Sequence, residues 1–127
     1  MIYGIGTDVV RIERIAAVYE RFGAHFVERL LLPQEREAFD AGRRPARFLA
    51  MRFAAKEAIV KALGTGFGHG VWIRDVGFLA NAWGRPEVLL SPRGRAVADR
   101  LGAGDGHVSL TDDAGLVIAV AVMMKKS

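Results

Sequence analysis

The chain of 127 residues contains no cysteine. It therefore has no disulfide framework, no thiolate site for zinc and no cysteine nucleophile. Although 51% of its residues are hydrophobic, no run reaches the roughly 18 apolar residues of a membrane-spanning helix. The N-terminal sequence MIYGIGTDVV lacks the basic start and the small-residue cleavage site of a signal peptide. These absences lead us to expect a cytoplasmic protein without a membrane span.

Acidic residues are fewer than basic ones, 14 against 18, which leaves a net charge of +4. A basic surface attracts anionic partners over long distances, and nucleic acid, phosphorylated cofactors and acidic proteins all qualify. The length predicts one domain, residues 1–127. A domain of this size can bury a substantial core.

Hydrophobic periodicity and turn residues predict an α+β fold, a small antiparallel sheet packed on one long helix with shorter helices. The expected strands are 2–10, 71–80, 87–90, 107–111 and 116–124, and the expected helices are 11–22, 25–32, 34–40, 47–63 and 92–101. Pro45 suits the first position of the long helix and Gly64 suits its C-terminal cap. Segments 102–106 and 112–115 are expected to be a loop and a turn.

Three charged residues, one in the first expected strand and two in the long helix, are candidates for a functional site. Glu57 and Lys61 are spaced for an ion pair on the solvated face of the long helix, worth roughly 0.2–0.5 kcal/mol. Asp8 follows Gly4 and Gly6 in the first strand, and its ordinary role would be a helix N-cap. Glycines inside a strand, however, often mark the close approach of another group. A functional role for the three charges is the alternative.

Three segments carry a family resemblance that spans nearly the whole chain. GIGTDVVRIERI at 4–15, RFAAKEAIVKALGTG at 52–66 and HVSLTDD at 107–113 together resemble the holo-[acyl-carrier-protein] synthases, which are small phosphopantetheinyl transferases. The resemblance implies the phosphopantetheinyl transferase fold. It also implies transfer of 4′-phosphopantetheine from coenzyme A to a serine of apo acyl carrier protein, with release of adenosine 3′,5′-bisphosphate.

The resemblance also assigns roles to individual residues. Asp8 and Glu57 match positions that hold Mg²⁺, a metal that typically takes one or two carboxylates and completes its shell with water and phosphate oxygens. These two and Lys61 form the implied catalytic group, with either Glu57 or a metal-bound water as the base. The implied contacts to coenzyme A come from Arg52, Lys56, Lys61, Gly64, Gly66, Pro86 and His107.

The last expected strand is apolar on both faces, so both faces need cover. A single layer of helices covers one face, and a second subunit is the natural cover for the other. The resemblance implies a homotrimer with coenzyme A bound between neighbours. Asp8, Glu57 and Lys61 would come from one subunit, and Pro86 and His107 from the next. A strand histidine with only a structural role is the alternative reading of His107.

Arg14, Val18 and Arg21 share a stripe on the first helix, away from its apolar face. Such a stripe is usually a solvated face, but basic residues around a valine also suit an acidic partner helix. The resemblance implies that this partner is the acidic acyl carrier protein. Some members of the family carry a histidine where this chain has Asp112, so a role for that histidine does not carry over.

Two other functions compete with this one. A small basic nucleic-acid-binding domain without catalysis would explain the excess of arginine, and Arg43, Arg44 and Arg47 could contact phosphates. That alternative leaves Asp8 and Glu57 unexplained and lacks an aromatic RNA-binding stripe. The larger phosphopantetheinyl transferases resemble two such units in one chain, and 127 residues suffice for one. We therefore expect no nucleic-acid partner.

Overall fold

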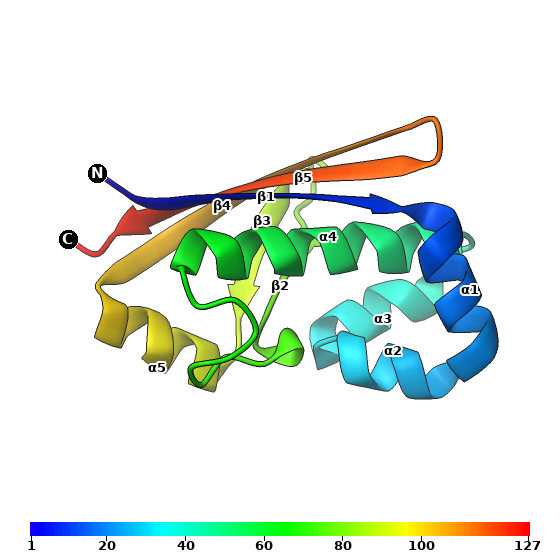
Figure 1. The fold of residues 1–127 in the computed structure, drawn as a ribbon, viewed down its shortest axis with the longest axis horizontal. Helices are drawn as coiled ribbons and strands as arrows, with labels where there is room; N and C mark the ends of the chain where they lie inside the picture. The colour runs from blue at the N-terminus through cyan, green and yellow to red at the C-terminus, as the bar shows by residue number, and fades with distance from the viewer.

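The computed structural model describes all residues, 1–127. Its elements follow the expected order, with a short 3₁₀ helix, η1, as the one addition (Figure 1). They are β1 (Ile2–Arg11), α1 (Ile12–Phe22), α2 (Ala24–Leu30), α3 (Pro33–Ala41), α4 (Pro45–Leu63), η1 (Ile73–Asp75), β2 (Val76–Ala80), β3 (Pro86–Leu90), α5 (Pro92–Leu101), β4 (Ala103–Asp113) and β5 (Leu116–Lys125).

One antiparallel sheet of five strands organises the chain, in the order β1-β5-β4-β3-β2. The helices lie on one side of β1, β5 and β4, with α4 running along the strands (Figure 1). None of the helices combines the length and the hydropathy that a bilayer span requires. The predicted α+β class, with a long helix against an antiparallel sheet, is confirmed.

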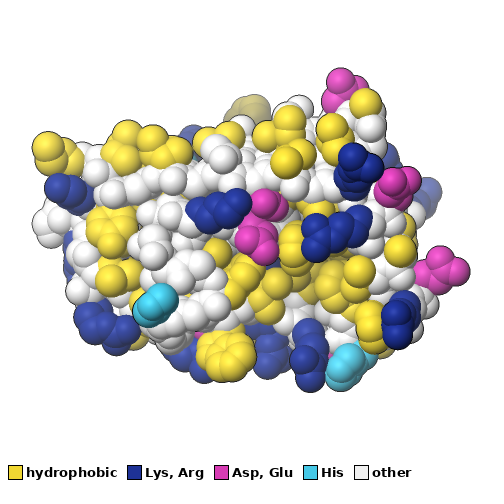
Figure 2. Space-filling model, viewed as in Figure 1, with side chains coloured by type: hydrophobic (Ala, Val, Ile, Leu, Met, Phe, Trp, Pro, Cys, Tyr) yellow, Lys and Arg dark blue, Asp and Glu magenta, His cyan; other side chains and the backbone are white.

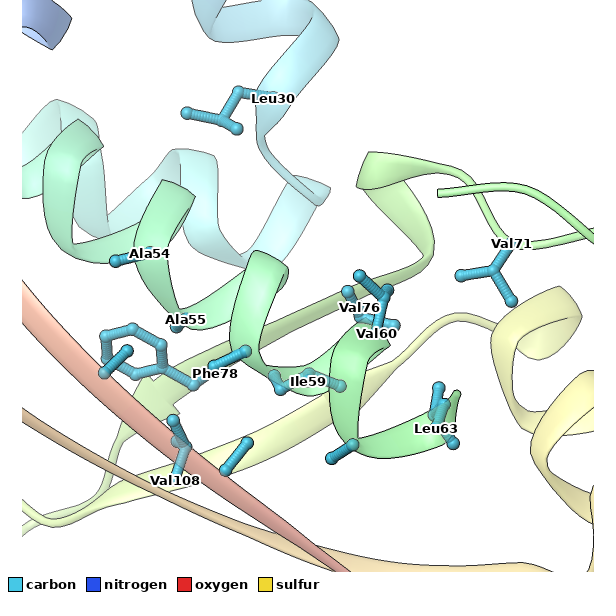
Figure 3. Close-up of a cluster of buried hydrophobic side chains, with 14 of the residues drawn as sticks. Leu30, Ala54, Ala55, Ile59, Val60, Leu63, Val71, Val76, Phe78 and Val108 are labelled. Atoms are coloured by element: carbon cyan, nitrogen blue, oxygen red, sulfur yellow. The ribbon is translucent and has the colours of Figure 1, made fainter. Parts of the chain in front are cut away.

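Helix α4 is the centre of the core. It starts at Pro45, whose missing N–H costs nothing at a helix start, and ends at Gly64, which adopts the left-handed conformation with φ of 82°. The sequence predicted a single apolar face, but the helix is buried around most of its circumference. Its fully buried Ile59 and Val60 pack in the same cluster as Val76 of β2 (Figure 3). A helix surrounded in this way fixes the positions of its few polar side chains.

Segment 71–80 was predicted as one strand, and half of that prediction is wrong. Pairing begins only at Val76, because the preceding residues turn through η1. The buried carboxylate of Asp75 holds the turn by accepting hydrogen bonds from Trp72 N at 2.8 Å and Ser91 Oγ at 2.7 Å. A side-chain acceptor thus competes with the ladder for backbone donors.

The predicted loop at 102–106 is also wrong, because β4 already pairs with β5 from Ala103. The glycines that suggested a loop instead permit close packing. A Cβ on Gly106 would lie 2.4 Å from Met123 Sδ. Asp112, expected in a turn, lies in β4, where Arg47 donates two hydrogen bonds to its carboxylate at 2.9 and 3.0 Å. Strand β4 therefore runs from Ala103 to Asp113 and is longer at both ends than the predicted strand 107–111.

Candidate active site

Two glycines of β1 bring that strand into direct contact with α4. A Cβ on Gly4 would lie 2.0 Å from the carbonyl oxygen of Ala62, and a Cβ on Gly6 would lie 2.0 Å from that of Ala58. Real Cβ atoms do not approach backbone oxygens so closely, so only glycine fits. The close approach inferred from the sequence is present, and it places Asp8, two residues further along β1, beside the last turns of α4.

Lys61 reaches from α4 to β1. Its Nζ donates to the carbonyl oxygen of Thr7 at 3.0 Å and lies 3.4 Å from Oδ1 of Asp8. The ordinary alternative, an ion pair between Glu57 and Lys61 along the helix, does not form. Lys61 is half exposed, whereas the Asp8 side chain is mostly covered. The ammonium group of Lys61 on α4 therefore pairs with a carboxylate on the neighbouring strand β1.

Glu57 shares this site with Asp8. Partial burial and the negative charge of Asp8 raise the pKa of Glu57, while Lys61 and Arg14 act in the opposite direction. The guanidinium of Arg14, on α1, lies 6.0 Å from the ring of Phe53, one turn before Glu57 on α4. On the face that carries α4, Figure 2 shows acidic side chains with basic ones on both sides. The carboxylates of Asp8 and Glu57 thus lie near two cations, Lys61 and Arg14.

These donors fit Mg²⁺. No group of three or more metal-binding side chains gathers anywhere in the chain, which argues against a site built wholly from protein ligands. Magnesium instead binds through one or two carboxylates, keeps several waters and accepts substrate phosphate oxygens. Two neighbouring carboxylates, one of which raises the pKa of the other, are suited to a divalent cation. Asp8 and Glu57 are the residues that would hold it.

Gly6 offers a test of how this site is built. Gly6→Ala should lower the free energy of unfolding by about 1–3 kcal/mol or more, the usual cost of overpacking, because its Cβ meets backbone oxygen. It should also push Asp8 away from α4. Gly68→Ala is the matched control, since a Cβ there meets nothing within 4 Å and Gly68 has no positive φ. Denaturant titrations at equal subunit concentration compare the two. Equal stability of both variants would contradict the close packing.

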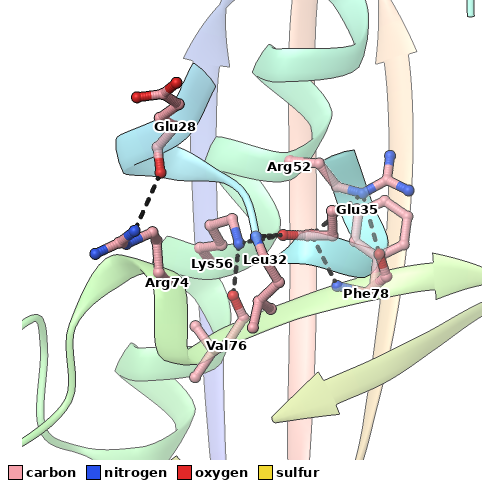
Figure 4. A network of polar contacts seen from close by, with 8 residues as sticks. All are labelled: Glu28, Leu32, Glu35, Arg52, Lys56, Arg74, Val76 and Phe78. Carbon is pink, nitrogen blue, oxygen red and sulfur yellow. Dashed lines mark hydrogen bonds and ion pairs between the residues drawn. The ribbon is translucent and has the colours of Figure 1, made fainter. Parts of the chain in front are cut away.

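The structure removes Arg52 and Lys56 from the implied contacts to coenzyme A (Figure 4). Lys56 is fully buried, and its Nζ donates to Oε1 of Glu35 and to the carbonyl oxygen of Val76, both at 2.6 Å. Arg52 is nearly buried and donates from Nε to the carbonyl oxygen of Phe78 at 3.1 Å. Both side chains point into the protein. Their predicted role in cofactor binding does not fit this burial, and we assign them to the core.

Glu35 on α3 is the centre of that buried network, a role that was not predicted from the sequence. Its Oε1 accepts from Leu32 N at 3.0 Å as well as from Lys56, and its Oε2 accepts from Phe78 N at 3.2 Å and lies 3.4 Å from Arg52 Nε. Burial lowers the pKa of Arg52 to about 10, which leaves it charged at neutral pH. The one available signal was the spacing of Glu35, three residues after the helix N-cap, where a carboxylate reaches back to the backbone.

Gly64 and Gly66 begin the loop that leaves α4, close in sequence to Lys61. Both have positive φ, 82° and 58°, and neither has any atom within 4 Å of a would-be Cβ. The space beside the Cα atoms of both glycines is therefore open. A side chain at either position would be strained by its backbone conformation as well.

Pro86 and His107 lie together at a different place, in a cavity of about 670 Å³ that also includes Arg85 and Arg95. Register places His107 opposite Val122, and Val122 opposite Ile5. Asp8 is three residues from Ile5 and therefore points to the other face of the sheet. Within one subunit, the sheet separates His107 from the carboxylate pair.

The stripe on α1 is present at the surface. Arg14 and Arg21 are exposed and Val18 is partly covered. Phe22, the last residue of α1, is half exposed, and the guanidinium of Arg21 lies 5.2 Å from its ring centre. The stripe thus presents two arginines with apolar surface beside them, and its Arg14 end adjoins the carboxylate pair.

Comparison with known proteins identifies the family to which this chain is similar. The model of the 4′-phosphopantetheinyl transferase superfamily matches residues 4–121. The holo-[acyl-carrier-protein] synthase of Azoarcus sp. strain BH72 is 48% identical over 125 residues, which cover 97% of this chain and 98% of that protein.

Solved structures of proteins with the same name also match this chain over nearly its whole length. The crystal structure of the holo-[acyl-carrier-protein] synthase from Neisseria meningitidis matches with a TM-score of 0.93 and 39% identity, covering 98% of this chain and all of that one. The Helicobacter pylori enzyme in complex with coenzyme A matches with a TM-score of 0.81 and 33% identity, covering 94% and 98%. Matches of this extent in sequence and structure show that the chain belongs to the 4′-phosphopantetheinyl transferase superfamily, among proteins named holo-[acyl-carrier-protein] synthase.

Proposed function

We propose that this protein transfers the 4′-phosphopantetheine group of coenzyme A to a serine of apo acyl carrier protein and releases adenosine 3′,5′-bisphosphate. The observation that carries the proposal is the convergence of Asp8, Glu57 and Lys61 at the contact between β1 and α4, in a chain whose relatives are named for this reaction. We also propose a cytoplasmic location, with which the absence of cysteine is compatible.

The chemistry required is mostly positioning and charge neutralisation, as in other phosphoryl transfers. Asp8 and Glu57 would hold Mg²⁺, which supplies neutralisation of the pyrophosphate charge when it is bound. Lys61, with three rotatable donors on a flexible stem, is suited to contact a phosphate oxygen. The group that accepts the serine proton would be either Glu57, whose pKa is raised by burial and by Asp8, or a water bound to the metal.

The proposal is tested by following coenzyme A with the purified protein and Mg²⁺. Liquid chromatography should detect adenosine 3′,5′-bisphosphate only when apo carrier protein is present. Release of this nucleotide should stop when the carrier is exhausted. A carrier whose acceptor serine is replaced with alanine is the matched control. Release of the nucleotide with that control, or without any carrier, would point to hydrolysis of coenzyme A instead of transfer.

The stripe on α1 is proposed to receive the carrier protein. Because the stripe is basic and adjoins Glu57, it suits an acidic carrier that must bring its serine to that residue. The double variant Arg14→Glu and Arg21→Glu should raise KM for the carrier about tenfold or more, with little change in KM for coenzyme A. Reversing the exposed Arg29 of α2 is the control. An unchanged carrier KM, insensitive also to salt, would place docking elsewhere.

The outer face of the sheet supports a homotrimer with shared sites. Ile5 and Val9 of β1 are 59% and 58% exposed, and Ile118 of β5 is 44% exposed. Figure 2 shows hydrophobic side chains along the edge of the molecule where β1 and β5 run. His107 lies on this same face. A neighbouring subunit packed there would cover the apolar residues and carry the His107 cavity to the carboxylate pair.

Complementation tests the shared site. Asp8→Asn and His107→Ala should each be nearly inactive alone, and unfolding and refolding them together should restore activity. Recovery is expected because some interfaces in a mixed ring pair an intact Asp8 with an intact His107. Refolding each variant by itself is the control. A monomer in sedimentation, or no recovery in proven mixed rings, would contradict the arrangement.

A further inference from the structure

The single ammonium group of Lys61 is needed at two places, beside Asp8 and at a phosphate of coenzyme A. In this structure its Nζ neutralises Asp8 at 3.4 Å and donates to Thr7 O at 3.0 Å. The proposed reaction, on which this inference rests, requires the same Nζ at a phosphate oxygen and a divalent cation at the same carboxylate. An ammonium group and Mg²⁺ cannot both contact Asp8 without strong repulsion between them.

The exposures of the two partners decide which one moves. The Asp8 side chain is 16% exposed and sits on a strand locked against α4, whereas the Lys61 side chain is 51% exposed. A half-exposed lysine on a flexible stem reorients at little cost. The pyrophosphate of coenzyme A carries more negative charge than one carboxylate, so its arrival gives Lys61 a better partner than Asp8.

We propose that Lys61 is an internal counter-ion for Asp8 that lowers the Mg²⁺ affinity of the free protein, so that tight metal binding follows coenzyme A. Once Nζ transfers to the pyrophosphate, the carboxylate is left for the metal. The order of binding is then set by a side chain that belongs to both sites. This role is separate from any contact that Lys61 makes in the transition state.

Calorimetric titration with Mg²⁺ tests this without measuring turnover. Lys61→Met should bind Mg²⁺ at least about fivefold more tightly than wild type in the absence of coenzyme A, within the range of typical coupling between sites. In the coenzyme A complex the affinity should be unchanged or weaker. Lys61→Arg should resemble wild type. Arg14→Gln, which removes a nearby charge that does not contact Asp8, should alter both states to the same small extent.

Two results would overturn the inference. The first is that free Lys61→Met binds Mg²⁺ no more tightly than wild type. The second is that Arg14→Gln gives the same gain in affinity, which would reduce the effect to the general electrostatic field of the surface. The proposed metal site is judged separately by Asp8→Asn. If that variant binds Mg²⁺ as well as wild type, the metal assignment itself is wrong, and the inference falls with it.

Discussion

Glu35→Gln should lower the free energy of unfolding by about 3–5 kcal/mol, the usual cost of leaving a buried charge without its partner. The fully buried Lys56 and the nearly buried Arg52 would then lose their counter-charge. Arg52 keeps part of its compensation, because its guanidinium lies 4.1 Å and 3.8 Å from the ring centres of Phe48 and Phe78. Lys56 has no such ring.

A second substitution separates charge from packing. Adding Lys56→Met to Glu35→Gln should recover part of the loss, because an apolar side chain of similar length replaces the buried cation. The control is Glu37→Gln, on the exposed side of the same helix, which should stay within about 0.5 kcal/mol of wild type. Urea titrations at one subunit concentration provide the comparison. If the Glu35 and Glu37 variants are equally stable, the network contributes little to the fold.

The pH dependence gives an independent check on Glu35→Gln. Burial lowers the pKa of Lys56, and the charge of Glu35 partly opposes that shift. Without Glu35 the folded pKa falls further below the unfolded one, so the unfolded state binds more protons between the two values. Stability of the variant should therefore rise with pH as that window is crossed upward. A destabilisation independent of pH would mean that lost packing, not charge, is responsible.

Asp8→Asn and Glu57→Gln should each reduce transfer on the order of 10³-fold or more. A metal ion contributes several kcal/mol to transition-state stabilisation, and about 1.36 kcal/mol corresponds to each tenfold in rate. Steady-state rates with saturating coenzyme A and carrier measure the effect. Near wild-type rates in either variant, with retained dependence on Mg²⁺, would remove that residue from the site.

Both substitutions should leave the fold intact, which separates a lost ligand from a lost structure. The pKa of Glu57 is raised above its ordinary value of 4.5, chiefly by burial and then by Asp8. Such a group costs stability once the pH exceeds its unfolded value, so Glu57→Gln should be as stable as wild type at neutral pH or slightly more stable. The difference should vanish as the pH falls below 4.5.

The sequence predicted the parts of this site that depend on close approach. Glycines at positions 4 and 6 indicated that another element touches β1, and the structure has α4 there. The order of elements followed from periodicity, because long amphipathic segments are the clearest signal in a single sequence. What the chain alone could not give was the partner of Lys61. The spacing favoured Glu57, one turn away, and the structure pairs it with Asp8, 53 positions earlier.

The burial of Arg52 and Lys56, which the resemblance had assigned to coenzyme A, could not be predicted from local spacing in the sequence. Lys56 precedes Glu57 in the sequence, but its side chain points about a third of a turn away around α4 and enters the core. Because α4 is buried around most of its circumference, hydrophobic periodicity does not distinguish its buried face from an exposed one. Its counter-ion, Glu35, comes from a different helix, and no local pattern joins them. Similarly, Gly106 resembled a loop residue until the packing of Met123 explained it. Long-range partners decide each of these cases.

Intact-mass spectrometry of an apo acyl carrier protein tests the central claim most directly. The wild-type protein with coenzyme A and Mg²⁺ should increase the carrier mass by one phosphopantetheine group, at the acceptor serine. The same mixture with chelator, or with Asp8→Asn in place of wild type, should leave the carrier mass unchanged. An unmodified carrier with the folded wild-type protein, or equal modification by Asp8→Asn, would contradict the account.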